Sequence, residues 1–175
     1  MPTPFFRHLT DDGLPGDGTN NEANVNGVIT PVPFYAGPTV GKRWTVSRLI
    51  IMVEDNAIFT PETYGGVGTL ANGVEIALWQ DGVAGTRKHD LLDGDPVNGI
   101  AHYSELCYDV SYQDFGSGNN FATARWTFTA SGGALLLDNK DGEIFVVTIN
   151  DDLTALVKHN FMIQGLEWGP GEYIQ

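Results

Sequence analysis

The sequence predicts an all-β fold, an antiparallel β-sandwich that we expect to be jelly-roll-like. Several segments alternate apolar and polar residues with a period of two, a pattern typical of strands that bury one face. Glycine-containing turns such as Asn72-Gly73 and Asp141-Gly142 separate these segments. Only residues 151–158 offer a helical pattern, and it would be about two turns long, so the sequence shows no helix to cross between parallel strands.

Residues 1–27 are predicted to form an extended N-terminal arm ahead of a β-sandwich domain at residues 28–175. Residues 11–27 contain almost no large side chains and many Gly, Asn and Asp. Such a segment buries too little surface to offset its own ordering entropy. Phe5, Phe6 and Leu9 precede it as a short apolar tip. The same residues are also compatible with a frayed terminus, or with a segment packed against its own domain.

The strands expected after the arm differ in their place in the sheets. Residues 28–35 contain two prolines, which confine the segment to a sheet edge or a passing arm. Residues 43–54 are apolar on both faces around 49–53, which favours a central strand. Residues 56–72 form a long loop that could reach a neighbouring molecule. The remaining expected strands are 74–79, 106–112, 122–129, 143–149 and 160–168.

Composition and charge exclude several classes of partner. The 175 residues suit one domain with a substantial core, and their net charge is −13. Nine lysine and arginine residues spread along the chain do not form the cationic surface that nucleic acids or anionic membranes require. Cys107 is the only cysteine, so an intrachain disulfide is impossible. The sequence has no apolar run of about 20 residues and no signal-peptide pattern, so we expect cytoplasmic synthesis.

No catalytic or metal-binding motif emerges from the sequence. The four histidines do not have ligand spacing, and Gly116-Ser117-Gly118 is a flexible loop rather than a nucleophile elbow. We therefore expect no enzyme activity, no cofactor and no metal site, although calcium binding at the acidic turns 11–12, 93–95 and 138–141 remains an alternative. Trp126 is expected in the core. Trp44, Trp79 and Trp168 leave open a glycan-binding function.

Four segments together resemble the small virion structural proteins of tailed bacteriophages, of the capsid decoration or cement type. They are residues 25–38, 43–55, 116–138 and 147–165, among them VNGVITPVPFYAGP and RWTVSRLIIMVED. The resemblance implies a β-sandwich with an N-terminal arm that holds neighbouring major capsid subunits together. It also implies a place on the capsid surface of the virion after synthesis in the host cytoplasm, and a homo-oligomer, trimer or dimer.

The residues expected to contact the capsid are aromatic, apolar or cationic. They are Phe5, Phe6, Arg7 and Leu9 in the arm, Phe34 and Tyr35 where it enters the domain, and Trp168 and Tyr173 near the C-terminus. Other virion positions, in the head–tail joint or the tail, remain alternatives. So do a glycan-binding module and, from another class again, an enzyme.

Overall fold

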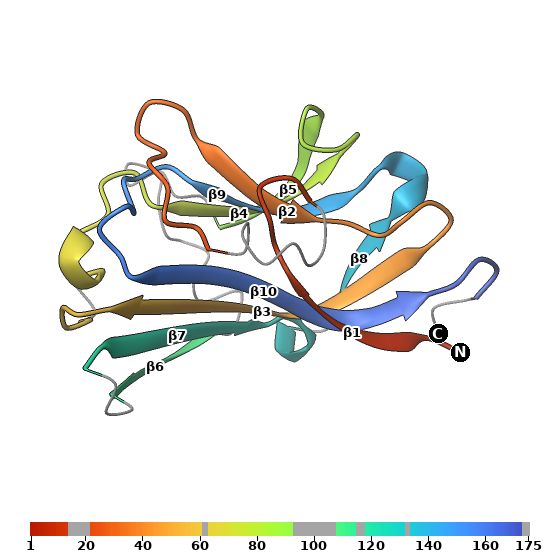
Figure 1. Cartoon of the computed structure of the whole chain (residues 1–175). Coiled ribbons are helices and arrows are strands. Elements are labelled where there is room, and N and C mark those ends of the chain that lie inside the picture. Colours follow the sequence, from red (N-terminus) through yellow and green to blue (C-terminus); the bar gives the residue numbers. More distant parts are fainter. Residues whose placement is uncertain (14–21, 61–62, 93–107, 115–117, 132–133, 173–175) are drawn as a thin grey trace.

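The computed structural model describes residues 1–13, 22–60, 63–92, 108–114, 118–131 and 134–172, without the side chains of 87–92, 108–110, 112–114, 130 and 131. In these residues the chain is all-β, with two antiparallel sheets and three short 3-10 helices (Figure 1). The expected fold class is confirmed at this level. The jelly-roll connectivity is not confirmed and stays a prediction.

Sheet A contains six strands, in the order β1-β10-β3-β7-β6, with β8 also paired to β3. Their bounds are Thr3–His8 (β1), Arg43–Asp55 (β3), Tyr108–Asp114 (β6), Asn120–Thr127 (β7), Leu135–Asp138 (β8) and Lys158–Trp168 (β10). β3 has neighbours on both sides along its length, which confirms the central position predicted from its apolar faces.

Sheet B contains four strands, in the order β2-β9-β4-β5. Their bounds are Val32–Ala36 (β2), Val74–Gln80 (β4), Thr86–Leu92 (β5) and Ile144–Ile149 (β9). The 3-10 helices are η1 (Gly65–Val67), η2 (Phe128–Ser131) and η3 (Asn139–Asp141). Strand β2, which contains Pro33 and follows Pro31, lies at the sheet edge, as the two prolines of residues 28–35 predict.

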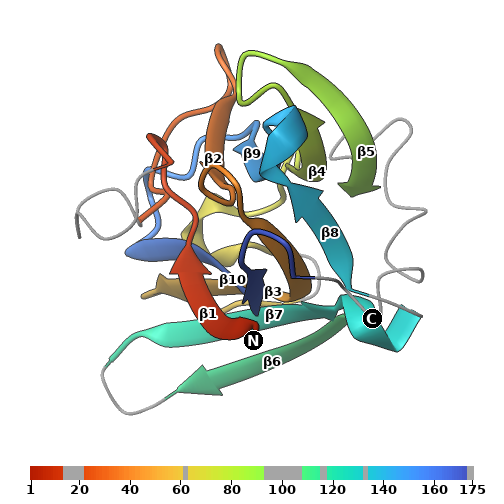
Figure 2. The ribbon, with the colours of Figure 1, turned by 90° about the vertical axis from the view of Figure 1, so that its right-hand side faces the viewer.

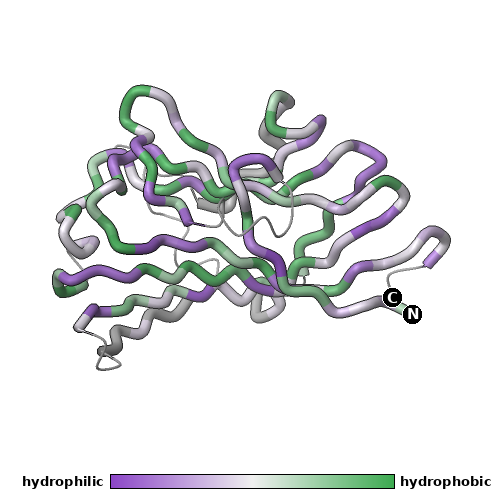
Figure 3. Tube along the Cα trace, viewed as in Figure 1, coloured by the Kyte–Doolittle hydropathy of each residue, from purple (hydrophilic) through white to green (hydrophobic). Residues whose placement is uncertain are grey.

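The hydrophobic core lies between the two sheets. Phe34 of β2 packs against Phe161 of β10 at 5.8 Å between ring centroids, so the sheets meet through aromatic side chains. Trp126 is buried, as predicted, and Ala122 and Ala124 of the same strand pack against the core. Figure 3 shows hydrophobic residues distributed along the strands of both sheets. Period-two alternation therefore identified the inward faces correctly.

The N-terminal residues belong to the body in this structure, and the extended arm is not confirmed. β1 pairs with β10 over its whole length, and Figure 2 shows it beside β10 at the edge of sheet A. Leu9 is 0% exposed and donates its N–H to the Phe161 carbonyl at 2.9 Å. Thr10 then forms a bridge to Tyr35 at the edge of sheet B. This arrangement is the packed alternative: the apolar tip finds its partners on the same chain. Residues 14–21 lie outside the described residues.

The long loop expected at residues 56–72 is held to the body rather than projecting freely. The buried Asp151 carboxylate accepts N–H hydrogen bonds from Ala71, Asn72 and Gly73 at 2.6–3.2 Å. Residues 151–158, the one helical option, form turns and the start of β10 instead of an α-helix. A carboxylate that accepts several backbone N–H groups satisfies a turn that would otherwise leave them buried and unpaired.

Candidate functional site

Two of the expected capsid-contact residues are buried in the core. Leu9 follows directly after β1, where the chain crosses to sheet B, and its side chain is buried. Phe34 packs on Phe161. A partner cannot reach either side chain while the domain stays closed, so the expectation that they bind it directly needs correction. Both were selected because they are large and apolar, and this property suits a core position equally well. Tyr173 lies outside the described residues.

Phe5 and Arg7 form a cluster with Trp44 on the inward side of β1. The rings of Phe5 and Trp44 are 4.5 Å apart, and the Arg7 guanidinium lies 6.0 Å from the Trp44 ring centroid. The Trp44 indole donates to Glu167 at 3.0 Å, and Lys42 pairs with the same carboxylate. Partial burial raises the pKa of Glu167, but the hydrogen bonds from Lys42 and Trp44 outweigh it and lower that pKa. Trp44 is buried, Phe5 and Arg7 are partly buried, and their contacts anchor β1 to its own sheet.

The opposite face of sheet A carries apolar side chains on three strands, β1, β10 and β8. The strand pairing places Pro4, Leu166, Thr45 and Leu136 in one cross-strand row, on β1, β10, β3 and β8. Their chain neighbours Trp44 and Leu137 are buried, so this row points away from the core. Side chains that lie opposite each other in such a row form one continuous surface.

We name this surface the outer patch; it consists of Pro4, Phe6, Leu136, Leu166 and Trp168. Phe6 is 53% exposed and Leu136 is 48% exposed. The Trp168 indole is held on this face by a 3.0 Å hydrogen bond to the Thr45 hydroxyl. Of the residues expected from the sequence, the structure thus places Phe6 and Trp168 on the same face of sheet A, and it adds Leu136 and Leu166. These two were missed because only the pairing of distant strands places them here.

Toward the middle of sheet A, this face contains buried polar atoms without hydrogen-bond partners among the described residues. His8 pairs with Met162, and Met162 pairs with Ile50, so an apolar stretch continues from the outer patch along the sheet. On the same face, the buried atoms His8 Nδ1, Arg48 Nε and Asn160 Oδ1 have no hydrogen-bond partner among the described residues. An unpaired buried polar atom costs about 1–3 kcal/mol.

β1 presents an open backbone edge next to the outer patch. In the described residues it pairs only with β10. The Leu9 N–H points toward β10, so strand alternation turns the N–H and C=O groups of Phe6 and His8 outward. By the same alternation the backbone of Pro4 points away from β10, so its lack of an N–H group removes no hydrogen bond between these two strands. The edge therefore offers backbone groups for an added strand.

The remaining sequence-based candidates do not assemble into a reactive site. The described residues contain no group of three His, Cys, Asp or Glu side chains placed to hold a metal ion. At the acidic turn 138–141, Asp138 caps η3 by accepting the Lys140 N–H. Of the other acidic turns, Asp12 accepts a hydrogen bond from the Thr10 hydroxyl, and 93–95 fall outside the described residues. Trp44 is buried, so it cannot stack on a sugar.

One histidine has strongly perturbed chemistry. His159 is fully buried on the core face of β10, and its Nε2 lies 2.7 Å from the Tyr64 hydroxyl. Burial lowers the pKa of His159 to about 3. It packs between Tyr64 and Phe161, at ring-centroid distances of 5.5 and 4.4 Å. The neutral imidazole of His159 packs between two aromatic rings and hydrogen-bonds to Tyr64. This contact is suited to holding the loop that contains Tyr64 in place.

Comparison with protein families, with curated proteins and with solved structures finds no match to the chain. No helix in the part of the chain that the structure describes is long and apolar enough to span a membrane.

Proposed function

We propose that the protein is a capsid decoration (cement) protein of a tailed bacteriophage and that it binds major capsid subunits through the outer patch. The sequence resemblance points to the capsid. The observation that carries the binding mode is the pair of exposed apolar side chains, Phe6 and Leu136, on the face of sheet A turned away from the core. Exposed apolar side chains that gather on one face of a domain are typical of a protein-binding site.

The expected energy per contact is modest, which suits a protein that acts in many copies. About half of the Phe6 and Leu136 side chains remains exposed, and burying it would contribute about 2–3 kcal/mol per copy. The open edge of β1 could add main-chain hydrogen bonds by accepting a strand from a capsid subunit. On a symmetric lattice such contacts repeat, and each bound copy raises the effective concentration of the next contact. β1 can fulfil this role while it stays paired with β10, without release of an arm.

Capsid co-sedimentation tests the proposal. The double variant Phe6→Asp/Leu136→Asp should bind capsids that lack the protein more than about tenfold more weakly, because charged groups replace the buried contacts. Ile29→Asp is the matched control: Ile29 is 94% exposed in the loop before β2, away from the outer patch, and its variant should bind as the wild type does. Thermal unfolding establishes that both variants fold. Equal capsid binding by all three proteins would refute the binding mode.

The same patch would serve in a head–tail joint or a tail, the alternative virion positions. Copy number per particle separates these assignments, because a shell protein occurs in hundreds of copies and an axial component in about a dozen or fewer. A homo-oligomer, trimer or dimer, remains part of the proposal and is tested by the mass of the free protein in solution.

A further inference from the structure

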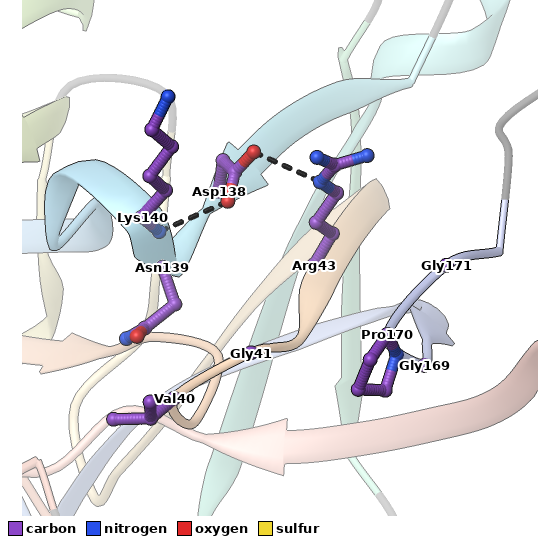
Figure 4. Close-up of a pocket in the computed structure, with 9 residues that line it drawn as sticks. All are labelled: Val40, Gly41, Arg43, Asp138, Asn139, Lys140, Gly169, Pro170 and Gly171. Atoms are coloured by element: carbon purple, nitrogen blue, oxygen red, sulfur yellow. Dashed lines mark hydrogen bonds and ion pairs between the residues drawn. The ribbon is translucent and has the colours of Figure 1, made fainter.

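A pocket of about 500 Å³ lies at the end of sheet A where the outer patch stops (Figure 4). Three turns enclose it: the one before β3, the η3 turn between β8 and β9, and the one after β10. Val40 and Pro170 line it with apolar surface, whereas Arg43, Asp138 and Lys140 supply charges. Trp168 pairs with Arg43, and Arg43 pairs with Asp138, so a single cross-strand row joins the outer patch to the pocket.

The walls of the pocket are tied together by hydrogen bonds. The Asn139 side chain donates to the Pro38 carbonyl at 2.7 Å, which links the η3 turn to the turn before β3. After β10, the Gly169 N–H donates to the Glu172 carboxylate at 2.6 Å, and the Glu172 N–H donates back to the Gly169 carbonyl at 3.2 Å. Such connections keep a site formed before any ligand arrives.

Asp138 holds the Arg43 side chain in place through one N–H group, which leaves the other N–H groups of the guanidinium available to a ligand. Its Nε donates to Asp138 Oδ2 at 2.8 Å, and Asp138 Oδ1 accepts the Lys140 N–H at 2.9 Å. The hydrogen bond from Lys140, with the charge of Arg43, lowers the pKa of Asp138, so this carboxylate stays ionised and keeps the guanidinium oriented. The two terminal amino groups of Arg43 have no hydrogen-bond partner among the described residues. Those amino groups form the end-on fork that matches two carboxylate oxygens.

We infer that this pocket binds a single carboxylate group, presented by an acidic side chain or a chain terminus, through the terminal amino groups of Arg43. Arg43, Lys140 and Asp138 line the pocket, and the carboxylates of Glu172 and Glu143 adjoin it, where they accept the N–H groups of Gly169 and Asp138. The directed amino groups of Arg43, rather than an excess of positive charge, would hold the ligand. In Figure 4 Lys140 and Arg43 lie on either side of Asp138. This balance suits a monoanion, because Asp138 would repel the second charge of a phosphate dianion. Val40, 91% exposed at the rim, offers contact to the aliphatic part of the ligand.

An NMR titration of the free protein with N-acetylglycine tests this assignment. At constant ionic strength, the backbone amide signals of Gly41, Gly169 and Gly171 should shift and saturate. N-acetylglycinamide, the uncharged analogue, should leave them unchanged, and inorganic phosphate should bind more weakly. Arg43→Gln should weaken binding by about tenfold, and Arg43→Lys should also weaken it, because an ammonium lacks the planar fork. Lys158→Gln is the control, since Lys158 lies at the other end of β10 and pairs with Glu22.

Absence of a saturable shift in the wild type, or equal affinity in wild type and Arg43→Gln, would overturn the inference. Tighter binding of phosphate than of N-acetylglycine would also overturn it, because the site would then favour dianions. Arg43 is largely exposed, so its substitution should leave the fold intact; the unchanged spectrum away from the pocket checks this. The inference is independent of the capsid assignment, since neither capsids nor the outer patch enter the test.

Discussion

Acidification should unfold the protein partly through one buried imidazole. His159 is fully buried, its Nδ1 has no hydrogen-bond partner among the described residues, and burial lowers its pKa to about 3. In the unfolded chain the same group has a pKa of about 6.5. Between these two values the unfolded state binds a proton that the folded state does not, so the free energy of unfolding falls as the pH falls. The stabilisation is complete above the unfolded pKa and is lost progressively toward the folded one.

The magnitude follows from the two pKa values. Between pH 7 and pH 4.5 the linkage relation predicts a loss of about 2–3 kcal/mol from His159 alone. This is a large part of the 5–15 kcal/mol or so that is typical of a domain. The lowered pKa values of Asp138, Asp152 and Glu167 also make the fold less stable in acid, so the histidine contribution must be measured against a variant that retains these carboxylates.

Urea unfolding of the wild type and of His159→Gln at pH 7, 5.5 and 4.5 is the assay. Glutamine can still hydrogen-bond to the Tyr64 hydroxyl but does not titrate, so the variant should lose stability less steeply with falling pH. The free energy of unfolding of the wild type should fall by about 2–3 kcal/mol more than that of the variant over this range. Parallel pH profiles would refute the reasoning, because they would show that His159 does not change its protonation between the folded and unfolded states.

Two further predictions concern the backbone of the sandwich. Asp151→Ala should lower the free energy of unfolding by about 2–4 kcal/mol, since it leaves the N–H groups of residues 71–73 without their acceptor; amide hydrogen exchange at these residues should accelerate, and unchanged exchange there would contradict the role. Gly165→Ala should cost at least about 2 kcal/mol in urea unfolding, because its Cβ would lie 2.0 Å from the Thr45 carbonyl oxygen, beside the bulge that Ser47 forms in β3; a variant as stable as the wild type would show that the two strands can separate here at little cost.

Local patterns predicted the strands that have one clear buried face. Alternation in residues 122–129 identified the inward side of β7, and the two-sided apolar stretch at 49–53 identified the centre of sheet A. Asp141-Gly142 forms a turn with Gly142 at a φ of +60°, a conformation that favours glycine. The short strand β8, with three consecutive leucines, escaped prediction because it carries no alternation.

The candidate site was only partly predictable. Phe6 and Trp168 were selected from the sequence as exposed anchors, and both lie on the outer patch. Leu9 and Phe34 were selected on the same criterion and are buried. Residue type alone does not distinguish a core aromatic from a surface one, because the hydrophobic effect favours burial wherever apolar surface is available, on the same chain or on a partner.

The sequence by itself determined the class of the fold, since side-chain alternation and turn propensities act between residues close along the chain. Only the tertiary structure decided where residues 1–10 lie, which face of sheet A stays apolar and exposed, and that Arg43 and Asp138 meet at a pocket. These features depend on pairing between residues as much as 164 positions apart, such as Thr3 with Glu167. Such pairing is set by the packing of the whole core, and no local stretch of sequence contains it.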